Sequence, residues 1–393
     1  MRRKTLPMIL IAFLTITFMA ALPVQGMHHA KPIVVAHSKG ALEPDTQLMY
    51  IMDNITYVEW RFVPEELTSD DLDGASMLIM SKSDSALEYT SAELSAINSW
   101  LSEGGKTIWV AADSDFGTDE MRIPTANDVL ESIGSKLRID HASAEDAVSN
   151  GGAPYRVLGV SANVDPEMEF LVRGVNRGLF HGPGIVAGYV NGEWMNLMEE
   201  DVEDVYVIMT TSDTGIIVDN QEPAPSVMTP GAEGNFPLMA LEVDMENENV
   251  IIASGESPFD QYVGLYRPEI IRMDRYGPQA NPQQGEYLFK NILRFATIFS
   301  EPWFEMKMEV SSLNIEIADY EETIDTLEAD MDELETQVSE CESEVSDLES
   351  QVTDLEGQIE QAQSRASTMQ LVAVAALVIG VVIGYFVGPM IKK

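Results

Sequence analysis

Apolar residues recur along the last third of the chain at alternating spacings of three and four, from Val310 to Ala362. A helix with this heptad repeat carries one continuous apolar stripe, which it buries against the stripe of a partner helix in a coiled coil. The first heptad positions are mostly β-branched and the fourth are mostly leucine, which favours two parallel strands. The pattern therefore predicts a long helix over residues 304–368 that forms a parallel homodimer. The stripe consists of Val310, Leu313, Ile317, Tyr320, Ile324, Leu327, Met331, Leu334, Val338, Cys341, Val345, Leu348, Val352, Leu355, Ile359 and Ala362.

The predicted coiled coil carries acidic residues on both sides of its stripe. Glutamate occupies the fifth position of six successive heptads, and no Lys or Arg occurs between Met308 and Ser364. Like charges across the contact destabilise a homodimer in low salt, so we expect salt, divalent cations or acid to strengthen it. A basic partner chain of different sequence is the alternative explanation. The glutamates are Glu321, Glu328, Glu335, Glu342, Glu349 and Glu356.

Cys341 is the only cysteine among the 393 residues and occupies a fourth heptad position. Two parallel helices bring these positions face to face, so outside the cell the two thiols are expected to form an interchain disulfide. The alternative is a free cysteine that packs as a small apolar side chain. One thiol cannot build a disulfide framework or a cysteine-based zinc site.

The N-terminus has the three parts of a signal peptide. Arg2, Arg3 and Lys4 precede an apolar run over residues 6–22, and small residues follow up to Gly26. We expect cleavage after Gly26, which makes residues 1–26 a signal peptide and the following part of the chain exported. An uncleaved N-terminal anchor is the alternative.

An uncharged stretch near the C-terminus predicts one transmembrane helix over residues 369–391. Its apolar part over residues 371–391 measures about 31 Å as a helix, which is enough to cross a bilayer. The lysines at 392–393 place a short tail in the cytoplasm by the positive-inside rule, so the protein is expected in the cell membrane with its N-terminal ectodomain outside. Gly380, Gly384 and Gly388 line one face, as in closely packed helices, although glycine is frequent in membrane helices generally.

Residues 27–303 make up the globular part. Its first half alternates apolar strands with helices, an order typical of a flavodoxin-like α/β fold with a parallel sheet covered on both faces. Residues 137–243 change to short strands separated by Gly and Pro, which we interpret as a β-rich insertion. A strand over 250–254 and an amphipathic helix over 287–299 complete the domain, and Pro302 separates it from the coiled coil. The strands of the first half are predicted over residues 32–36, 57–63, 76–80 and 107–112, and two helices over 46–55 and 127–133. Another helix is predicted to follow a capping box at residues 90–93 and to end at Gly104-Gly105.

Three segments of the globular part carry a family resemblance. Residues 89–116 contain a helix, a double-glycine turn and the strand TIWVAADSDF, and residues 249–259 (NVIIASGESPF) and 285–295 (GEYLFKNILRF) follow later. Together they resemble the class I glutamine-amidotransferase-like domain found in auxiliary subunits of gliding-type ABC transporters and at the N-terminus of an oligosaccharyltransferase subunit. The resemblance implies a flavodoxin-like sheet and a non-catalytic role in association with a protein or a glycan.

The residues available for chemistry follow two predicted strands. Catalytic amidotransferases attack their substrate with a cysteine, and the globular part has none, so we expect neither catalysis nor a cofactor. A degenerate serine- or metal-dependent hydrolase is the alternative, because strand ends of an α/β sheet bind ligands and carboxylates there suit Ca²⁺ or Mg²⁺. Such carboxylates also commonly cap turns. The candidate ligand-binding residues are Asp113, Ser114, Asp115, Glu256 and Ser257.

Two local motifs add further candidates. Cleavage after Gly26 leaves a chain that begins Met27-His28-His29, and a free amino group with histidine in third place can bind Cu(II) or Ni(II) through nitrogen. An unliganded terminus is the alternative. Asn54, in Asn-Ile-Thr, is a candidate glycosylation site.

The whole chain carries 65 acidic and 23 basic side chains, a net charge of -42, which excludes binding to the phosphate backbone of nucleic acids. We therefore interpret the chain as a non-catalytic cell-surface protein whose head binds an envelope protein or a glycan. An exported accessory subunit of a membrane transporter or of a glycosylation complex is the alternative.

Overall fold

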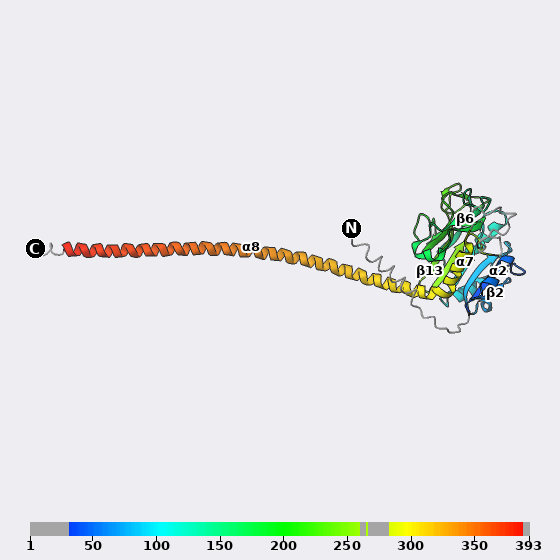
Figure 1. Ribbon diagram of the computed structural model, residues 1–393, viewed down its shortest axis with the longest axis horizontal. Coiled ribbons are helices and arrows are strands. Elements are labelled where there is room, and N and C mark those ends of the chain that lie inside the picture. Colours follow the sequence, from blue (N-terminus) through cyan, green and yellow to red (C-terminus); the bar gives the residue numbers. More distant parts are fainter. Residues whose placement is uncertain (1–30, 260–264, 266–282, 388–393) are drawn as a thin grey trace. The chain divides into compact units, whose positions relative to one another are not determined.

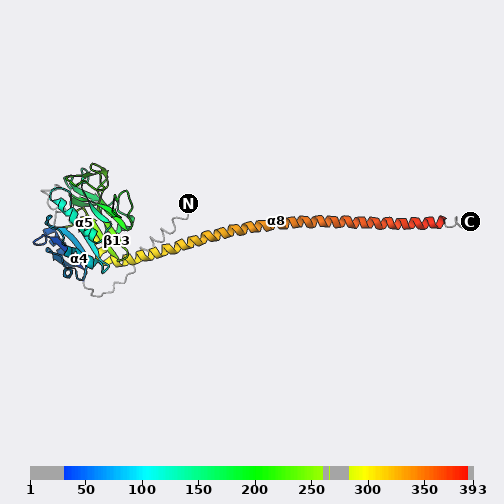
Figure 2. The ribbon, with the colours of Figure 1, turned by 180° about the vertical axis from the view of Figure 1, so that it is seen from behind.

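The computed structural model describes residues 31–259, 265 and 283–387. The chain divides after Met306 into a globular head and a helical segment, and each is described by itself. Figure 1 shows the ribbon, and Figure 2 shows it from behind. The predicted signal peptide, the candidate metal ligands at 27–29, Gly388 and the tail at 392–393 lie outside the described residues.

Five parallel strands form the centre of the head in the spatial order β2-β1-β3-β4-β14. This is the order of a flavodoxin-like doubly wound sheet, in which the chain starts near the middle and crosses over in both directions. The expected parallel α/β sheet is confirmed. The strands are β1 (Ile33–Lys39), β2 (Glu59–Val63), β3 (Ala75–Lys82), β4 (Thr107–Ala111) and β14 (Asn249–Ser254).

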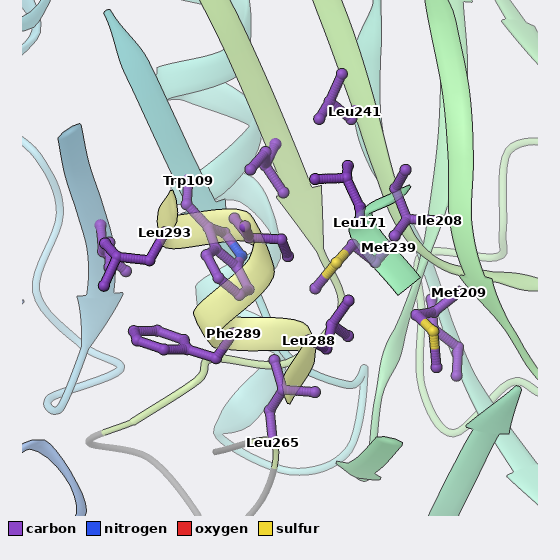
Figure 3. Packing of buried hydrophobic residues seen from close by; sticks show 14 of the residues in the cluster. Trp109, Leu171, Ile208, Met209, Met239, Leu241, Leu265, Leu288, Phe289 and Leu293 are labelled. Carbon is purple, nitrogen blue, oxygen red and sulfur yellow. The ribbon is translucent and has the colours of Figure 1, made fainter. Parts of the chain in front are cut away.

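Helices cover both faces of this sheet, because each strand buries apolar side chains on both sides. One buried cluster includes Leu48 and Phe289 from the helices of one face, and a second includes Ile97 and Val129 from the other. Figure 3 shows Phe289 beside Trp109 of β4, and their ring centroids are 5.9 Å apart. The helices are α2 (Thr46–Asn54), α3 (Ser69–Leu72), α4 (Ser91–Leu101), α5 (Arg122–Ser132) and α7 (Gly285–Arg294).

Antiparallel strands extend the central sheet to nine strands and build a second sheet of five. The order β13-β10-β6-β7 continues beyond β14, and the second sheet has the order β12-β11-β5-β8-β9. These strands occupy the region in which β-rich material was expected. They are β5 (Leu137–Asp146), β6 (Arg156–Val160), β7 (Arg177–His181), β8 (Gly184–Val190), β9 (Glu193–Met195), β10 (Val205–Thr210), β11 (Gly215–Val218), β12 (Glu233–Gly234) and β13 (Pro237–Asp244). A 3-10 helix η1 (Asp119–Met121) precedes α5, and another, η2 (Pro166–Val172), lies between β6 and β7.

The last element is α8, a single helix of 88 residues from Ser300 to Val387. Pro302 does not separate it from the head as expected, because the π-helical segment η3 (Phe295–Phe299) leads directly into it. In this segment the Ser300 N–H bonds to the Phe295 carbonyl, five residues back, so a wider helical turn precedes the proline. The side chains of the heptad stripe are exposed from Leu313 onward. Up to Gly384, the helix contains a stretch long and apolar enough to cross a membrane.

Candidate functional site

Two carboxylic acids meet at the carboxyl edge of the parallel sheet. Ser254 of β14 pairs with Ala111 of β4, so Asp113 and Glu256, each two residues further on, lie beside each other. Both side chains are fully buried. Two of the candidate acidic residues, which are 143 positions apart in the sequence, therefore lie together at this edge of the sheet.

The two acids have unequal sets of partners. Asp113 accepts a hydrogen bond from the Ser114 N–H at 2.8 Å and pairs with the Arg122 guanidinium at 3.3 Å. Glu256 accepts one bond through Oε2, from the His181 N–H at 2.8 Å, and its Oε1 is buried without a hydrogen-bond partner. Glu256 is therefore the member of the pair that better accommodates a proton.

Burial raises the pKa of both carboxyl groups well above the usual range. For Asp113 the carboxylate of Asp119 raises it further and Arg122 opposes the change. For Glu256 the next cause is the negative charge of Asp113 itself. Because each ionised carboxylate disfavours ionisation of the other, the pair retains a proton at pH values where exposed acids are ionised.

Asp115 holds a loop of the second sheet. It accepts hydrogen bonds from the Asn220 N–H at 2.6 Å and the Asn220 Nδ2 at 2.7 Å, and from the Ser143 hydroxyl. The Ser257 hydroxyl donates to the Phe259 carbonyl at 2.6 Å. Asp115 and Ser257 thus serve the local backbone.

Ser114 also bonds to the backbone, since its Oγ accepts the Phe116 N–H at 3.3 Å. A serine nucleophile needs a hydrogen bond to a base such as histidine. The interactions of Ser114 and Ser257 include no histidine. Within the described residues there is likewise no group of three or more His, Cys, Asp or Glu side chains arranged to hold a metal ion.

Close backbone packing fills the space beside the acid pair. A Cβ atom on Gly255 would lie 1.9 Å from the Gly184 carbonyl oxygen, and one on Gly184 would lie 2.5 Å from the Asp113 carbonyl oxygen. These glycines permit β8 of the second sheet to approach the ends of β4 and β14. Gly255 lies directly before Glu256, and a glycine at a strand end is the sequence signal for such an approach.

A second buried cluster surrounds Glu93 and was only partly foreseen. Thr90 and Glu93 form the capping box that begins α4, as the sequence suggested. The Glu93 carboxylate also accepts bonds from the Lys39 Nζ at 2.5 Å and the Leu67 N–H at 3.1 Å, and His37 Nε2 lies 3.7 Å away.

Protonation within this cluster follows from its contacts. Burial alone would raise the pKa of Glu93, but the bonds from Lys39, Thr90 and Leu67 outweigh it and hold that pKa below its usual value. Burial lowers the pKa of His37, so its ring is neutral near pH 7. Lys39 and Glu93 therefore form a buried ion pair that joins β1 to α4.

Arg122 and Lys82 connect the loops at the same edge. The Arg122 side chain donates to the carbonyls of Lys82 at 3.0 Å and Ser83 at 3.3 Å. Lys82 donates through Nζ to the Thr125 hydroxyl at 2.8 Å and the Met121 carbonyl at 3.3 Å, and burial lowers its pKa to about 8. Sequence reasoning did not single out either residue, because their partners come from other loops.

The remaining candidates lie on exposed surfaces. Asn54 is exposed at the C-terminal end of α2, where its Nδ2 donates to the Tyr50 carbonyl at 2.8 Å. Cys341 is an exposed free cysteine on α8. A Cβ atom added to Gly380 or Gly384 would have open space around it.

Comparisons with known proteins identify no family. No family model matches the chain, and no curated protein matches it. Among solved structures, the N-terminal domain of mmIFT52 is 11% identical, over 68% of this chain and 97% of that one, with a TM-score of 0.45. A ThuA-like protein from Bacteroides uniformis is 13% identical, over 70% and 95%, with a TM-score of 0.38. A GMP synthase protein from Thermoplasma acidophilum is 13% identical, over 72% and 100%, with a TM-score of 0.32. The fold class therefore rests on the strand order and register described above.

Proposed function

We propose that this chain is a non-catalytic cell-surface protein, anchored by one transmembrane helix, whose α/β head is presented on a dimeric coiled-coil stalk. One observation carries the proposal: α8 bears first an exposed heptad stripe and then an apolar stretch long enough to cross a bilayer. A signal peptide over residues 1–26 and a cytoplasmic tail at 392–393 complete the topology.

Exposure of the stripe supports the dimer. Leucine, isoleucine and valine side chains along α8 face solvent in the single chain, including Leu334, Leu348 and Val352. A contiguous apolar surface of this length is typical of a surface that binds another helix. A second copy supplies an identical stripe, and the interchain disulfide at Cys341 follows from its place on it.

The buried edge of the sheet supports a role in binding without chemistry. The hydroxyls of Ser114 and Ser257 bond to backbone groups, and Asp115 holds a loop. Asp113 and Glu256 lie under packed backbone, fully buried. The binding partner of the head is then an envelope protein or a glycan that recognises its surface.

The full chain in detergent micelles provides the test. Light scattering is expected to give the mass of a dimer in high salt, and gels without reductant are expected to show a disulfide-linked dimer that the Cys341→Ser variant lacks. Leu334→Asp with Leu348→Asp places charges on the stripe and should give a monomer. Ser343→Asp with Ser350→Asp adds the same charge off the stripe and should leave the dimer intact. A monomeric wild-type chain in every condition would refute the dimer.

A further inference from the structure

Three neighbouring loops line the carboxyl edge of β1, β3 and β4: residues 40–45, 83–90 and 112–121, called the edge loops below. The three strands are adjacent in the sheet, about 4.8 Å apart, so the loops are adjacent as well. Ligands of open α/β folds bind outside this edge. The exposed side chains of the edge loops therefore lie where a ligand of such a fold would contact the protein.

The edge loops are joined by bonds between their backbones and buried side chains. The N–H groups of Ser83 and Asp84 both donate to the Lys39 carbonyl, at 3.1 and 3.3 Å. Arg122 and Lys82 connect the second loop to the third through the contacts described above. Loops held in this way present their side chains with little conformational entropy left to lose on binding.

Four large apolar side chains of the edge loops nevertheless face solvent. Leu42 is 99% exposed and Phe116 is 67% exposed, and Leu87 and Met121 are also exposed. A single exposed apolar residue is ordinary on a protein surface. Four of them on three adjacent rigid loops resemble the apolar anchors at the centre of protein–protein interfaces.

Every charged residue within the edge loops themselves is acidic. The edge loops contain no Lys or Arg, and their acidic residues include Glu43 and Glu88, which are exposed. The cations at this edge point inward: Lys39 pairs with Glu93, and Arg122 pairs with Asp113. In the described part of this edge, a partner therefore meets apolar side chains among exposed acidic ones.

We propose that the edge loops bind a cationic polypeptide segment that inserts apolar side chains between Leu42, Leu87, Phe116 and Met121. The proposal rests on the proposed function of the head as a binding module and names the chemistry of its partner. Lysines or arginines of the partner lie against Glu43, Asp84 and Glu88, which steers association and makes it weaker in high salt.

The test uses the full chain in detergent micelles and three labelled synthetic peptides of equal length. The first peptide places Lys and Leu on opposite faces of a helix, and the second replaces each Lys of the first by Glu. The third has the same composition as the first, but its residues are scrambled so that no helix face is apolar. Fluorescence anisotropy is expected to show that the first peptide binds best and that 0.5 M salt weakens it.

Substitutions locate the binding on the head and separate it from any binding by the acidic stalk. The Leu42→Ser, Phe116→Ser double variant should weaken binding of the Lys/Leu peptide at least tenfold, because two anchors are lost. The Val148→Ser, Tyr287→Ser variant removes two apolar side chains that are exposed elsewhere on the head, and it should bind as the wild type does. Unchanged tryptophan fluorescence verifies that both variants are folded.

A photo-crosslinking residue provides a second readout that does not depend on affinity. Placed at Leu87, it should crosslink the Lys/Leu peptide, and placed at Val148 it should not. Equal affinities of the two double variants, equal crosslinking at the two positions, or no binding by the wild type would overturn the proposal. Binding by the head at another position would leave the binding role standing, and the dimer is tested separately by light scattering.

Discussion

At the scale of single residues, the buried acids of the head have opposite effects on how its stability depends on pH. Glu93 and Asp146 accept several hydrogen bonds, which outweigh burial and hold the pKa of each below its usual value. Asp113 and Glu256 lack enough partners, and burial raises the pKa of each. The first group stabilises the head when ionised, and the second opposes folding when ionised.

The Glu256→Gln variant is expected to raise the free energy of unfolding at pH 7 by about 1–2 kcal/mol, because the Glu256 carboxyl must take up a proton when the head folds at pH 7, whereas a glutamine is neutral in both states. Because the pKa of Glu256 is higher in the folded head than in the unfolded chain, its protonated carboxyl stabilises the head fully below about pH 4. This contribution to the free energy of unfolding is lost as the pH rises through the folded-state pKa. The variant should flatten that part of the pH profile. All five tryptophans precede the stalk, so urea unfolding followed by tryptophan fluorescence reports on the head.

The exposed Glu199→Gln substitution is the control for this measurement and should leave the profile unchanged. A Glu256→Gln head that is less stable than the wild type between pH 6 and 8 would show that the carboxylate is ionised and satisfied, which contradicts the shared proton.

The Glu93→Ala variant is expected to lower the free energy of unfolding at pH 7 by about 3–5 kcal/mol, because Lys39 would remain buried without its partner. Because the pKa of Glu93 is lower in the folded head than in the unfolded chain, its ionised carboxylate stabilises the head fully above about pH 4.3. This stabilisation is lost as the pH falls through the folded-state pKa. The loss from the substitution should therefore shrink in acid. Glu103→Ala breaks the exposed pair with Lys106 and should cost less than about 1 kcal/mol.

At the scale of elements, local patterns predicted the strands and helices of the first half except the short α3, because each strand there is a short run of apolar residues. β5 was missed, since Asp140 and Asp146 interrupt its apolar pattern. Both are buried and accept hydrogen bonds from other loops, Asp140 from the Val227 N–H and Asp146 from the Ser212 hydroxyl. A charged residue within a strand is recognisable as an interior one only when its distant partners are known.

The Gly255→Ala variant tests the contact between the two sheets. Its Cβ would lie 1.9 Å from the Gly184 carbonyl oxygen, and the backbone there cannot move away without separating β8 from β14. We expect a loss of more than about 3 kcal/mol in the free energy of unfolding, or failure to fold. Gly117→Ala, where only a positive φ opposes the substitution, should cost about 1 kcal/mol, and equal effects of the two would refute the close contact.

At the scale of the whole molecule, the net charge of -42 acts on assembly more than on the fold of the head. In the proposed dimer, the six glutamates beside the heptad stripe would repel their counterparts in the second chain. Leu334, Val338 and Val345 would favour that dimer through the same contact. The ionic strength therefore sets how far repulsion between the glutamates offsets the free energy that apolar contact contributes to association.

We expect the dissociation constant of the dimer to fall at least tenfold between 0.05 and 1 M salt, because the Debye length falls from more than 10 Å to about 3 Å. Sedimentation of the reduced chain in detergent measures it. Glu335→Gln with Glu342→Gln should tighten the dimer in low salt and reduce the salt dependence. The same change at Glu333 and Glu340, away from the fifth heptad positions, should do less. A dimer insensitive to salt would indicate that the glutamates do not face each other.

The amino-acid sequence by itself determined the features that depend on neighbours along the chain. These are the long C-terminal helix, the parallel order of strands and helices, and the capping box at Thr90, because helix periodicity, strand runs and caps are local. The tertiary structure alone decided which acids meet. Asp113 lies beside Glu256, Asp115 bonds to Asn220, and Glu93 pairs with Lys39, because strand order and register bring these distant residues together. Burial raises the pKa of Asp113 and Glu256, whereas the bonds that Glu93 accepts outweigh its burial, so tertiary contacts and not residue type set which of these acids keep a proton.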